Sequence, residues 1–455
     1  MRPLARIRYG IAASLAAMLV AGAALAAPIV TKEGVLPFGT ELGEDAAALP
    51  TELFATELAG GERSYQQKLG DMLFSSPALF GGVAKQAGMS CNTCHAQGAG
   101  NAALFVPGLS SRHGNFDTTG ALFNPKTDNG LFDPVTVPSL RGAKNLAPYG
   151  HDGRFASLRD FIRNVVVNEF AGPEPSGGVL DALVAYVQDI SFLPNPKMTS
   201  DGKLTAAASQ AAHRGEVVFN RPFRHNASMS CATCHQPSNA FVDGQVHDIG
   251  SGGRFKTKTL VNADFNAPYF HDGRFDSYDQ VVGYFDKHYD LGLSDGERAD
   301  LVAYLDAVGD ASTPATTDTV QTELDEIAVF VSVLDTAIHD HNAAIVAVAV
   351  DTVGGEWREL GEHYPEAKNT SVTAGLKQRG TARAAVREMV LTLRQVDMAA
   401  ARGDFDAAAE AYADYREQVA PATSALAAAE PFSLFDPSVR RQHFAALARL
   451  AELAK

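Results

Sequence analysis

The chain has 455 residues, 46% of them hydrophobic, and its 53 acidic and 38 basic side chains give a formal charge of −15. A length of this order predicts two to four globular domains with buried cores. The acidic balance argues against nucleic acid or an anionic membrane as a partner, and it favours solubility or a basic protein partner.

The first 26 residues have the pattern of a signal peptide. Arg2, Arg6 and Arg8 precede an apolar run that ends in Ala24-Leu25-Ala26, a small-residue cleavage site. This run is short for a membrane-spanning helix, and the best later apolar stretch, AAIVAVAV at 343–350, is far too short. We therefore expect cleavage after residue 26, export to the periplasm and no membrane span in the mature chain.

The four cysteines of the chain fall in two copies of one motif. MSCNTCH contains Cys91, Cys94 and His95, and MSCATCH contains Cys231, Cys234 and His235. C-x-x-C-H is the attachment site of c-type haem, in which the two thiols bind the porphyrin and the histidine ligates the iron. Disulfides would leave both histidines unexplained, and zinc knuckles lie much closer together than 140 residues. The sequence predicts two covalently bound haem c groups.

The two motifs belong to an internal repeat. Each copy runs from a helix through C-x-x-C-H and a Gly-rich loop to a T/V-x-x-x-L segment, then to APY-x-HDGRF and amphipathic helices. The closing helices align as ALVAY at 182–186 and DLVAY at 300–304, with apolar residues spaced to face a haem. A Pro- and Gly-rich break, SFLPNPKMTSDG, separates the copies near residue 195.

From about residue 313 the composition becomes Ala-rich with helical periodicity, after the linker TPATTDT. It predicts an antiparallel bundle of four or five helices, with stops at Gly403 and Pro421. The fold class is therefore all-α, with two tandem cytochrome c-like haem domains followed by a helical bundle. The predicted boundaries are 27–195 for the N-terminal haem domain, 196–312 for the C-terminal haem domain and 313–455 for the bundle.

Over residues 60 to 310 the chain resembles the bacterial dihaem cytochrome c peroxidase and MauG family. The resemblance rests on the paired C-x-x-C-H motifs, LFSSPAL before the first motif, APYFHDG in the second copy and the closing LVAYL-type helices. It implies a peroxidatic N-terminal haem and a C-terminal haem that relays electrons. By the same analogy it implies a calcium ion between the haem domains.

The residues beyond the first HDGRF suit peroxide chemistry. Reduction of H2O2 needs an acid/base group beside the bound peroxide, and Glu169 matches the family's distal glutamate in position. His113, in a Gly/Ser-rich loop 18 residues after His95, is the candidate for a removable sixth ligand. The alternatives are a surface glutamate at a helix end and a solvent-facing loop histidine.

The second haem has no methionine ligand downstream of its motif within its own repeat, because Met389 and Met398 lie far away. Its sixth ligand is sought among Tyr284, His247, His271 and His288. The family's ligand position falls on Tyr284 or Phe285, and phenylalanine cannot ligate iron. Tyrosine or histidine would lower the potential of the haem relative to methionine.

The doubled APY-x-HDGRF segment predicts a tight turn, with the aspartate bonding local N–H groups and the glycine at positive φ. Arg154 and Arg274 are then expected near haem propionates, and His151 and His271 either pack on the haem or ligate it. The family's usual bridging tryptophan is replaced by His151, so electron transfer between the haems would use His151, other groups or direct edge contact.

These features predict a periplasmic dihaem oxidoreductase that reduces H2O2 with electrons from a small cytochrome c or cupredoxin. Two alternatives stay open, a MauG-like enzyme acting on a protein or organic substrate and a non-enzymatic dihaem electron-transfer protein. A homodimer is a further expectation, and the role of the C-terminal helices is not predicted.

Overall fold

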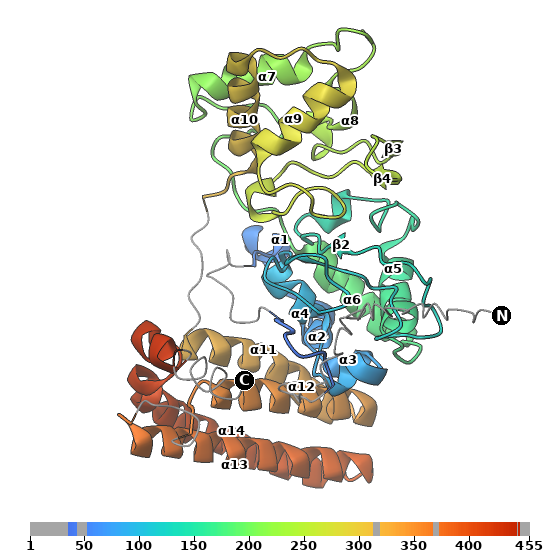
Figure 1. Cartoon of the computed structure of the whole chain (residues 1–455). Coiled ribbons are helices and arrows are strands. Elements are labelled where there is room, and N and C mark those ends of the chain that lie inside the picture. The colour runs from blue at the N-terminus through green and yellow to red at the C-terminus, as the bar shows by residue number, and fades with distance from the viewer. Residues whose placement is uncertain (1–34, 43–51, 313–318, 367–372, 444, 446–455) are drawn as a thin grey trace, which may run out of the picture.

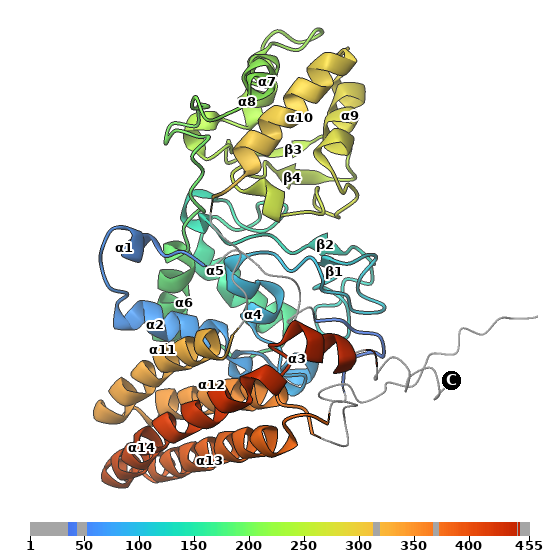
Figure 2. The same ribbon diagram turned by 90° about the vertical axis from the view of Figure 1, so that its left-hand side faces the viewer.

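The computed structural model describes residues 35–42, 52–312, 319–366, 373–443 and 445. The signal peptide predicted at residues 1–26 lies outside these residues. The chain is arranged in three tiers (Figures 1 and 2), with residues 210–309 at the top, residues 65–189 in the middle and four long helices at the bottom. We call residues 65–189 the first repeat and residues 210–309 the second repeat.

Helices dominate the described chain, which confirms the all-α class. After the short α1 (Ala55–Leu58), the first repeat contains α2 (Tyr65–Phe74), α3 (Gly82–Gln86), α4 (Cys91–Cys94), α5 (Leu158–Asn164) and α6 (Gly177–Asp189). The second repeat contains α7 (Gln210–Asn220), α8 (Cys231–Cys234), α9 (Tyr278–Tyr289) and α10 (Asp295–Gly309). Each repeat adds one small antiparallel ribbon, β1 (Asn115–Phe116) with β2 (Val135–Thr136) and β3 (Val246–Asp248) with β4 (Arg254–Lys256).

The first and last helices of each repeat cross at a glycine. A Cβ on Gly70 of α2 would lie 2.1 Å from the carbonyl oxygen of Ala182 in α6, and one on Gly215 of α7 would lie 1.9 Å from that of Asp300 in α10. A side chain at either position would push the helices apart. The two crossings are equivalent, which supports the internal repeat.

The C-terminal helices are α11 (Val320–His339), α12 (Ala343–Glu362), α13 (Leu376–Ala401) and α14 (Phe405–Ala429). Each packs on the next, and α14 returns to α11. The predicted stop at Gly403 is confirmed, because its φ of 75° follows the last turn of α13. The predicted stop at Pro421 is wrong, since Pro421 lies inside α14. Proline removes only one backbone donor, and the packing of α14 along α13 keeps the helix intact.

The hydrophobic core connects the first repeat to the C-terminal helices. One cluster of buried side chains runs from Met72 and Phe74 in α2 through Phe330 of α11 to Trp357 of α12. The second repeat has a smaller cluster of its own around Phe219 and Tyr304. Within the described residues, every helix is too short or too polar to cross a bilayer.

Candidate active site

Both C-x-x-C-H motifs line one cavity of about 540 Å³ between the repeats. Each motif forms a single helical turn that begins at a serine. Ser90 and Thr93 form a capping box for α4, and Ser230 and Thr233 form one for α8. The S-C-x-T-C-H pattern therefore fixes the turn that presents the two thiols and the histidine together.

The two motif histidines are suited to ligate haem iron. His95 Nδ1 lies 3.0 Å from the carbonyl oxygen of Pro138, and His235 Nδ1 lies 3.2 Å from that of Phe241. A carbonyl accepts only from an N–H, so the proton sits on Nδ1 and Nε2 is the free ligand atom. Burial lowers the pKa of His95 to about 4 and also lowers that of His235, so both rings are neutral near pH 7. These residues and the cavity fit two haem c groups.

Equivalent aromatic side chains pack behind the two histidines. The Phe74 ring lies 6.4 Å from the His95 ring and 5.0 Å from that of Tyr186. In the second repeat Phe219 lies 6.5 Å from His235 and 4.8 Å from Tyr304. The same cluster of tilted histidine, phenylalanine and tyrosine rings therefore supports both motifs.

The two HDGRF segments form the predicted turns. Tyr149 and Phe155 bridge one turn, and Tyr269 and Phe275 bridge the other. Asp152 and Asp272 each accept from the backbone N–H of the arginine two residues on. The glycines that follow these aspartates, at positions 153 and 273, have φ of 68° and 76°. The predicted turn chemistry is confirmed in both copies.

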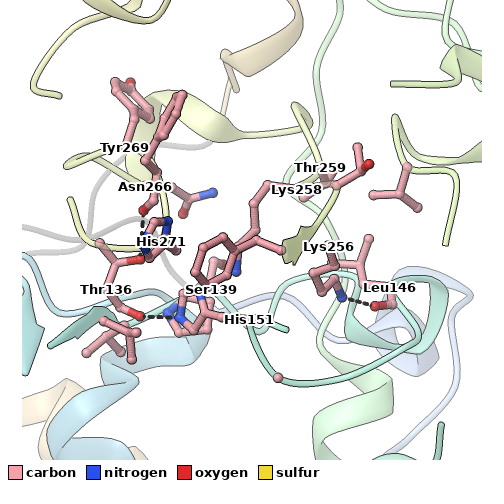
Figure 3. A pocket seen from close by; sticks show the side chains of 18 of the residues that line it. Thr136, Ser139, Leu146, His151, Lys256, Lys258, Thr259, Asn266, Tyr269 and His271 are labelled. Carbon is pink, nitrogen blue, oxygen red and sulfur yellow. Dashed lines mark hydrogen bonds between the residues drawn. The ribbon is translucent and has the colours of Figure 1, made fainter. Parts of the chain in front are cut away.

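Each turn is hydrogen-bonded to the ribbon of the other repeat. The N–H of Thr136 in β2 donates to the carbonyl oxygen of His271 at 2.7 Å, and the N–H of Lys256 in β4 donates to that of His151 at 2.9 Å. His151 Nε2 also lies 2.8 Å from the carbonyl oxygen of Thr136. The turns therefore hold the repeats together across a seam, where Figure 3 shows His151, His271 and Lys258 gathered at one side of the cavity.

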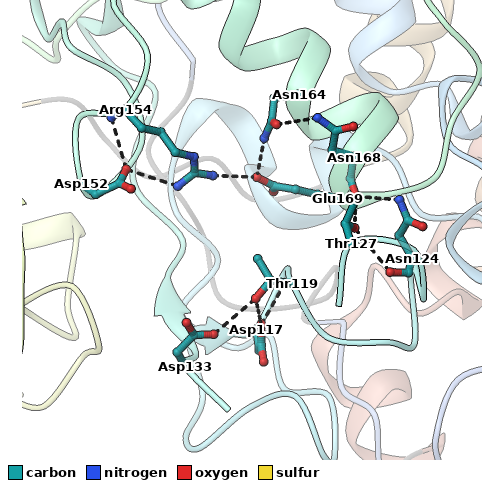
Figure 4. A network of polar contacts seen from close by, with 10 residues as sticks. All are labelled: Asp117, Thr119, Asn124, Thr127, Asp133, Asp152, Arg154, Asn164, Asn168 and Glu169. Carbon is teal, nitrogen blue, oxygen red and sulfur yellow. Dashed lines mark hydrogen bonds and ion pairs between the residues drawn. The ribbon is translucent and has the colours of Figure 1, made fainter. Parts of the chain in front are cut away.

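Glu169 lies in the part of the cavity that belongs to the first repeat. It ends a π-helical turn, Val165–Glu169, that follows α5, and its residue is only 8% exposed. Such turns are frequent at functional sites. Arg154 donates to Glu169 Oε1 at 3.1 Å and Asn164 Nδ2 donates to the same atom at 3.0 Å (Figure 4). Burial raises the pKa of Glu169, although Arg154, Thr118 and Asn164 oppose the rise.

The structure brings three of the predicted first-repeat residues together and separates a fourth. His95, His151 and Glu169 line the cavity, whereas His113 is outside its lining. The His113 side chain is 54% exposed, lies 3.1 Å from Glu41 and stacks on Phe105. The structure therefore gives His113 a surface ion pair in place of the predicted approach to the iron.

Tyr284 is also turned away from the cavity. Its hydroxyl donates to the carbonyl oxygen of Ile249 at 2.5 Å, while the next residue, Phe285, lines the cavity. The helical register of α9 thus places phenylalanine at the position where the sequence predicted a ligand. Of the other candidates, His247 and His271 line the cavity and His288 does not. His247 pairs with Asp243 at 2.6 Å, and His271 stacks on Phe255 at 3.6 Å.

The two turn arginines differ. Arg154 lines the cavity and bonds Asp152 and Glu169. Arg274 is not part of the cavity lining, and it bonds Asp272 and the carbonyl oxygen of Ser251. Only Arg154 is thus placed within reach of a haem propionate in this cavity.

Two lysines in the cavity were not predicted from the sequence. Lys256 and Lys258 both line the cavity at the seam, and burial lowers their pKa values to about 8 and about 7. They are the only Lys, Arg, Asp or Glu side chains that the described part of the second repeat brings to the cavity. Calcium takes oxygen ligands, mostly carboxylates and carbonyls, so neither amine can serve as a ligand, and the calcium ion expected between the repeats stays a prediction.

Comparison with known proteins finds similarity to one family. The model of the di-haem cytochrome c peroxidase family matches residues 215–430. This match covers nearly all of the second repeat and reaches α14, beyond the expected limit of residue 310, but it begins after the first repeat. Hydrazine synthase subunit gamma of Kuenenia stuttgartiensis is 25% identical over 253 residues, 42% of this chain and 69% of that protein. The methylamine utilization protein MauG of Methylophilus methylotrophus is 28% identical over 135 residues, 22% of this chain and 38% of MauG. The resemblance drawn from the sequence is confirmed, and the family implies binding of haem c.

Two solved structures are also similar. A Kuenenia stuttgartiensis hydrazine synthase chain aligns with a TM-score of 0.40 and 20% identity, over 68% of this chain and 99% of that chain. A MauG-like protein associated with microbial copper homeostasis aligns with a TM-score of 0.36 and 15% identity, over 57% of this chain and 93% of that chain.

Proposed function

We propose that this relative of the di-haem cytochrome c peroxidases is an exported, periplasmic oxidoreductase that carries two covalent haem c groups and reduces H2O2 in its first repeat. The second repeat relays electrons from a small cytochrome c or cupredoxin. The observation that carries the proposal is the buried carboxyl of Glu169, which shares one cavity with His95.

The residues of the first repeat divide the work of such a reaction. A haem on Cys91, Cys94 and His95 would supply the iron and electrons. Burial raises the pKa of Glu169, which suits a group that accepts a proton from bound peroxide and returns it to the departing oxygen. Arg154 and Asn164 hold the carboxyl in place by bonding the same oxygen. The second repeat has no carboxylate in the described lining of the cavity, so this chemistry is assigned to the first repeat.

The substitution that tests the assignment is Glu169→Gln. A positioned acid/base group is worth about 10²–10⁴ in rate, so we expect peroxide turnover to fall by at least about 100-fold with both haem spectra unchanged. Glu174→Gln is the matched control, since Glu174 is exposed and pairs with Arg163 at the surface. Full activity in Glu169→Gln would contradict the acid/base role.

A MauG-like oxidation of a protein or organic substrate is the second candidate. It is favoured by the seam, where His151 takes the place of the family's bridging tryptophan and where the described lining of the cavity contains no tryptophan. Optical and EPR titration with H2O2 separates the enzymes from an electron-transfer cytochrome. A high-spin ferric haem that reacts with peroxide supports an enzyme, whereas two low-spin, unreactive haems contradict it. Product analysis with a reduced donor cytochrome then distinguishes the two enzymes.

A further inference from the structure

Lys258 has an unusual position at the seam. When the two repeats are aligned, Lys258 in the second repeat corresponds to Pro138 in the first. Lys258 lines the cavity together with His235, and its side chain extends toward the first repeat (Figure 3). Burial lowers the pKa values of His151 and His271, and the nearby Lys258 ammonium lowers each further. Lys258 therefore lines the cavity shared by the two motifs, close enough to the histidines of both turns to influence them.

The neighbouring lysine differs in having acceptors. Lys256 Nζ donates to the carbonyl oxygens of Leu146 and Pro148, the latter at 2.6 Å. Within the described residues, Lys258 has no carboxylate at ion-pair distance and no hydrogen-bond acceptor for its amine. His151, whose pKa the charge of Lys258 lowers, has its Nδ1 atom buried without a partner. Lys258 is half-buried, and an ammonium that lines a cavity without a partner is stabilised when an anion binds beside it.

We propose that Lys258 binds a haem propionate at the seam and there supplies the positive charge expected of a calcium ion. A carboxylate is the anion that the haem brings to this cavity, and a lysine ammonium bonds it with charge assistance. This assignment rests on the haem occupancy of the proposed function.

The assignment makes Lys258 a positioning residue with an electrostatic effect on the iron. The reduced haem carries one more negative charge than the oxidised haem, so a nearby ammonium stabilises the reduced form. Removal of the charge should lower the midpoint potential of the haem whose propionate it binds. It should also change the environment of that propionate, which a mere structural role of the side chain would not do selectively.

The experiment compares Lys258→Met, Lys258→Arg and Lys287→Met in the full holoprotein. Lys287 is exposed on α9 and serves as the matched control. Spectroelectrochemical titration at pH 7 gives both haem potentials, and resonance Raman spectroscopy gives the propionate bending bands. We expect a lower potential and a shifted band in Lys258→Met, restoration in Lys258→Arg and wild-type behaviour in Lys287→Met.

Unchanged potentials and propionate bands in Lys258→Met with two haems bound would overturn the assignment of Lys258 to a propionate and leave the proposed function standing. Should Lys258→Met fail to retain haem, Lys258→Gln removes the charge while keeping a hydrogen-bond donor, and it is read in the same way. A pyridine haemochrome assay counts haem independently. Absence of haem from the wild-type protein would contradict both this assignment and the proposed function.

Discussion

The two repeats share one scaffold and differ where the chain leaves it. Both have the glycine helix crossing, the capped motif turn, the aromatic cluster and the HDGRF turn. After the turn, however, the first repeat reaches Glu169, and the second reaches Phe285 at the cavity and Tyr284 away from it. At the register of Pro138 the second repeat carries Lys258. The common scaffold therefore holds the cofactors, and a few following side chains assign the chemistry.

The repeats also differ in what supports them. The core of the first repeat continues into the C-terminal helices through α2 and α11, whereas the second repeat depends on its own smaller cluster. The first repeat and the C-terminal helices thus form one packed unit.

The largest expected effect is the loss of one haem at a time. Cys91→Ser combined with Cys94→Ser should leave one covalent haem, on the second repeat, and Cys231→Ser combined with Cys234→Ser should leave one on the first. The haemochrome assay on each purified variant measures the number directly. Loss of both haems in either variant would show that the motifs do not act independently.

The helix crossings test the difference in support. Gly215→Ala would force a methyl group against the Asp300 carbonyl and should destabilise the second repeat by about 1–3 kcal/mol in denaturant unfolding. Gly296→Ala in α10 is the control, because a methyl group there meets nothing within 4 Å. Gly70→Ala creates the same clash in the first repeat, against the carbonyl oxygen of Ala182. Loss of stability in Gly296→Ala equal to that in Gly215→Ala would contradict the role of the crossing.

The junction between α2, α6 and α11 should make stability depend on pH. Burial, and next the charge of Asp71, raise the pKa of Glu52 to about 8, although Tyr186 donates to its carboxylate at 2.7 Å. A carboxyl whose pKa is raised in the folded state stabilises the fold fully below the pKa of the unfolded chain, 4.5. This stabilisation is lost as the pH rises to about 8, by at most about 1.4 kcal/mol per pH unit. Burial also raises the pKa values of Asp71 and Glu326.

The denaturant midpoint of unfolding should therefore decrease as the pH is raised from 5 to 8 in the wild type. It should fall less steeply in Glu52→Gln, which removes one of the titrating groups. Glu62→Gln, at a nearby exposed glutamate, is the control and should follow the wild type. Equal slopes in all three proteins would contradict the assigned pKa of Glu52.

The smallest effects are expected at the two residues predicted as ligands and found elsewhere. His113→Ala removes a surface ion pair worth at most about 1 kcal/mol and should leave the spin state of the first haem unchanged. Tyr284→Phe should likewise leave the second haem spectrum unchanged. A spectral shift in either variant would show that the chain rearranges around the haem to reach the iron.

The sequence predicts local features well and cross-repeat features poorly. The motif turns, the HDGRF turns and the entry of Glu169 into the cavity follow from spacing, local hydrogen bonding and resemblance. The structure does not place Tyr284 in the cavity as a ligand, because the register of α9 turns the neighbouring Phe285 toward the cavity instead. The bonds from Thr136 to His271 and from Lys256 to His151, and the junction of Glu52 with Glu326, join residues more than 100 positions apart, which no local pattern encodes.

The most direct test of the division of labour mixes H2O2 with the two single-haem variants and follows each haem by stopped-flow absorbance. We predict that the variant with haem only on Cys91 and Cys94 reacts rapidly, and that Glu169→Gln in that variant abolishes the reaction. The variant with haem only on Cys231 and Cys234 should stay unreactive. Rapid reaction at the second haem alone would contradict the account.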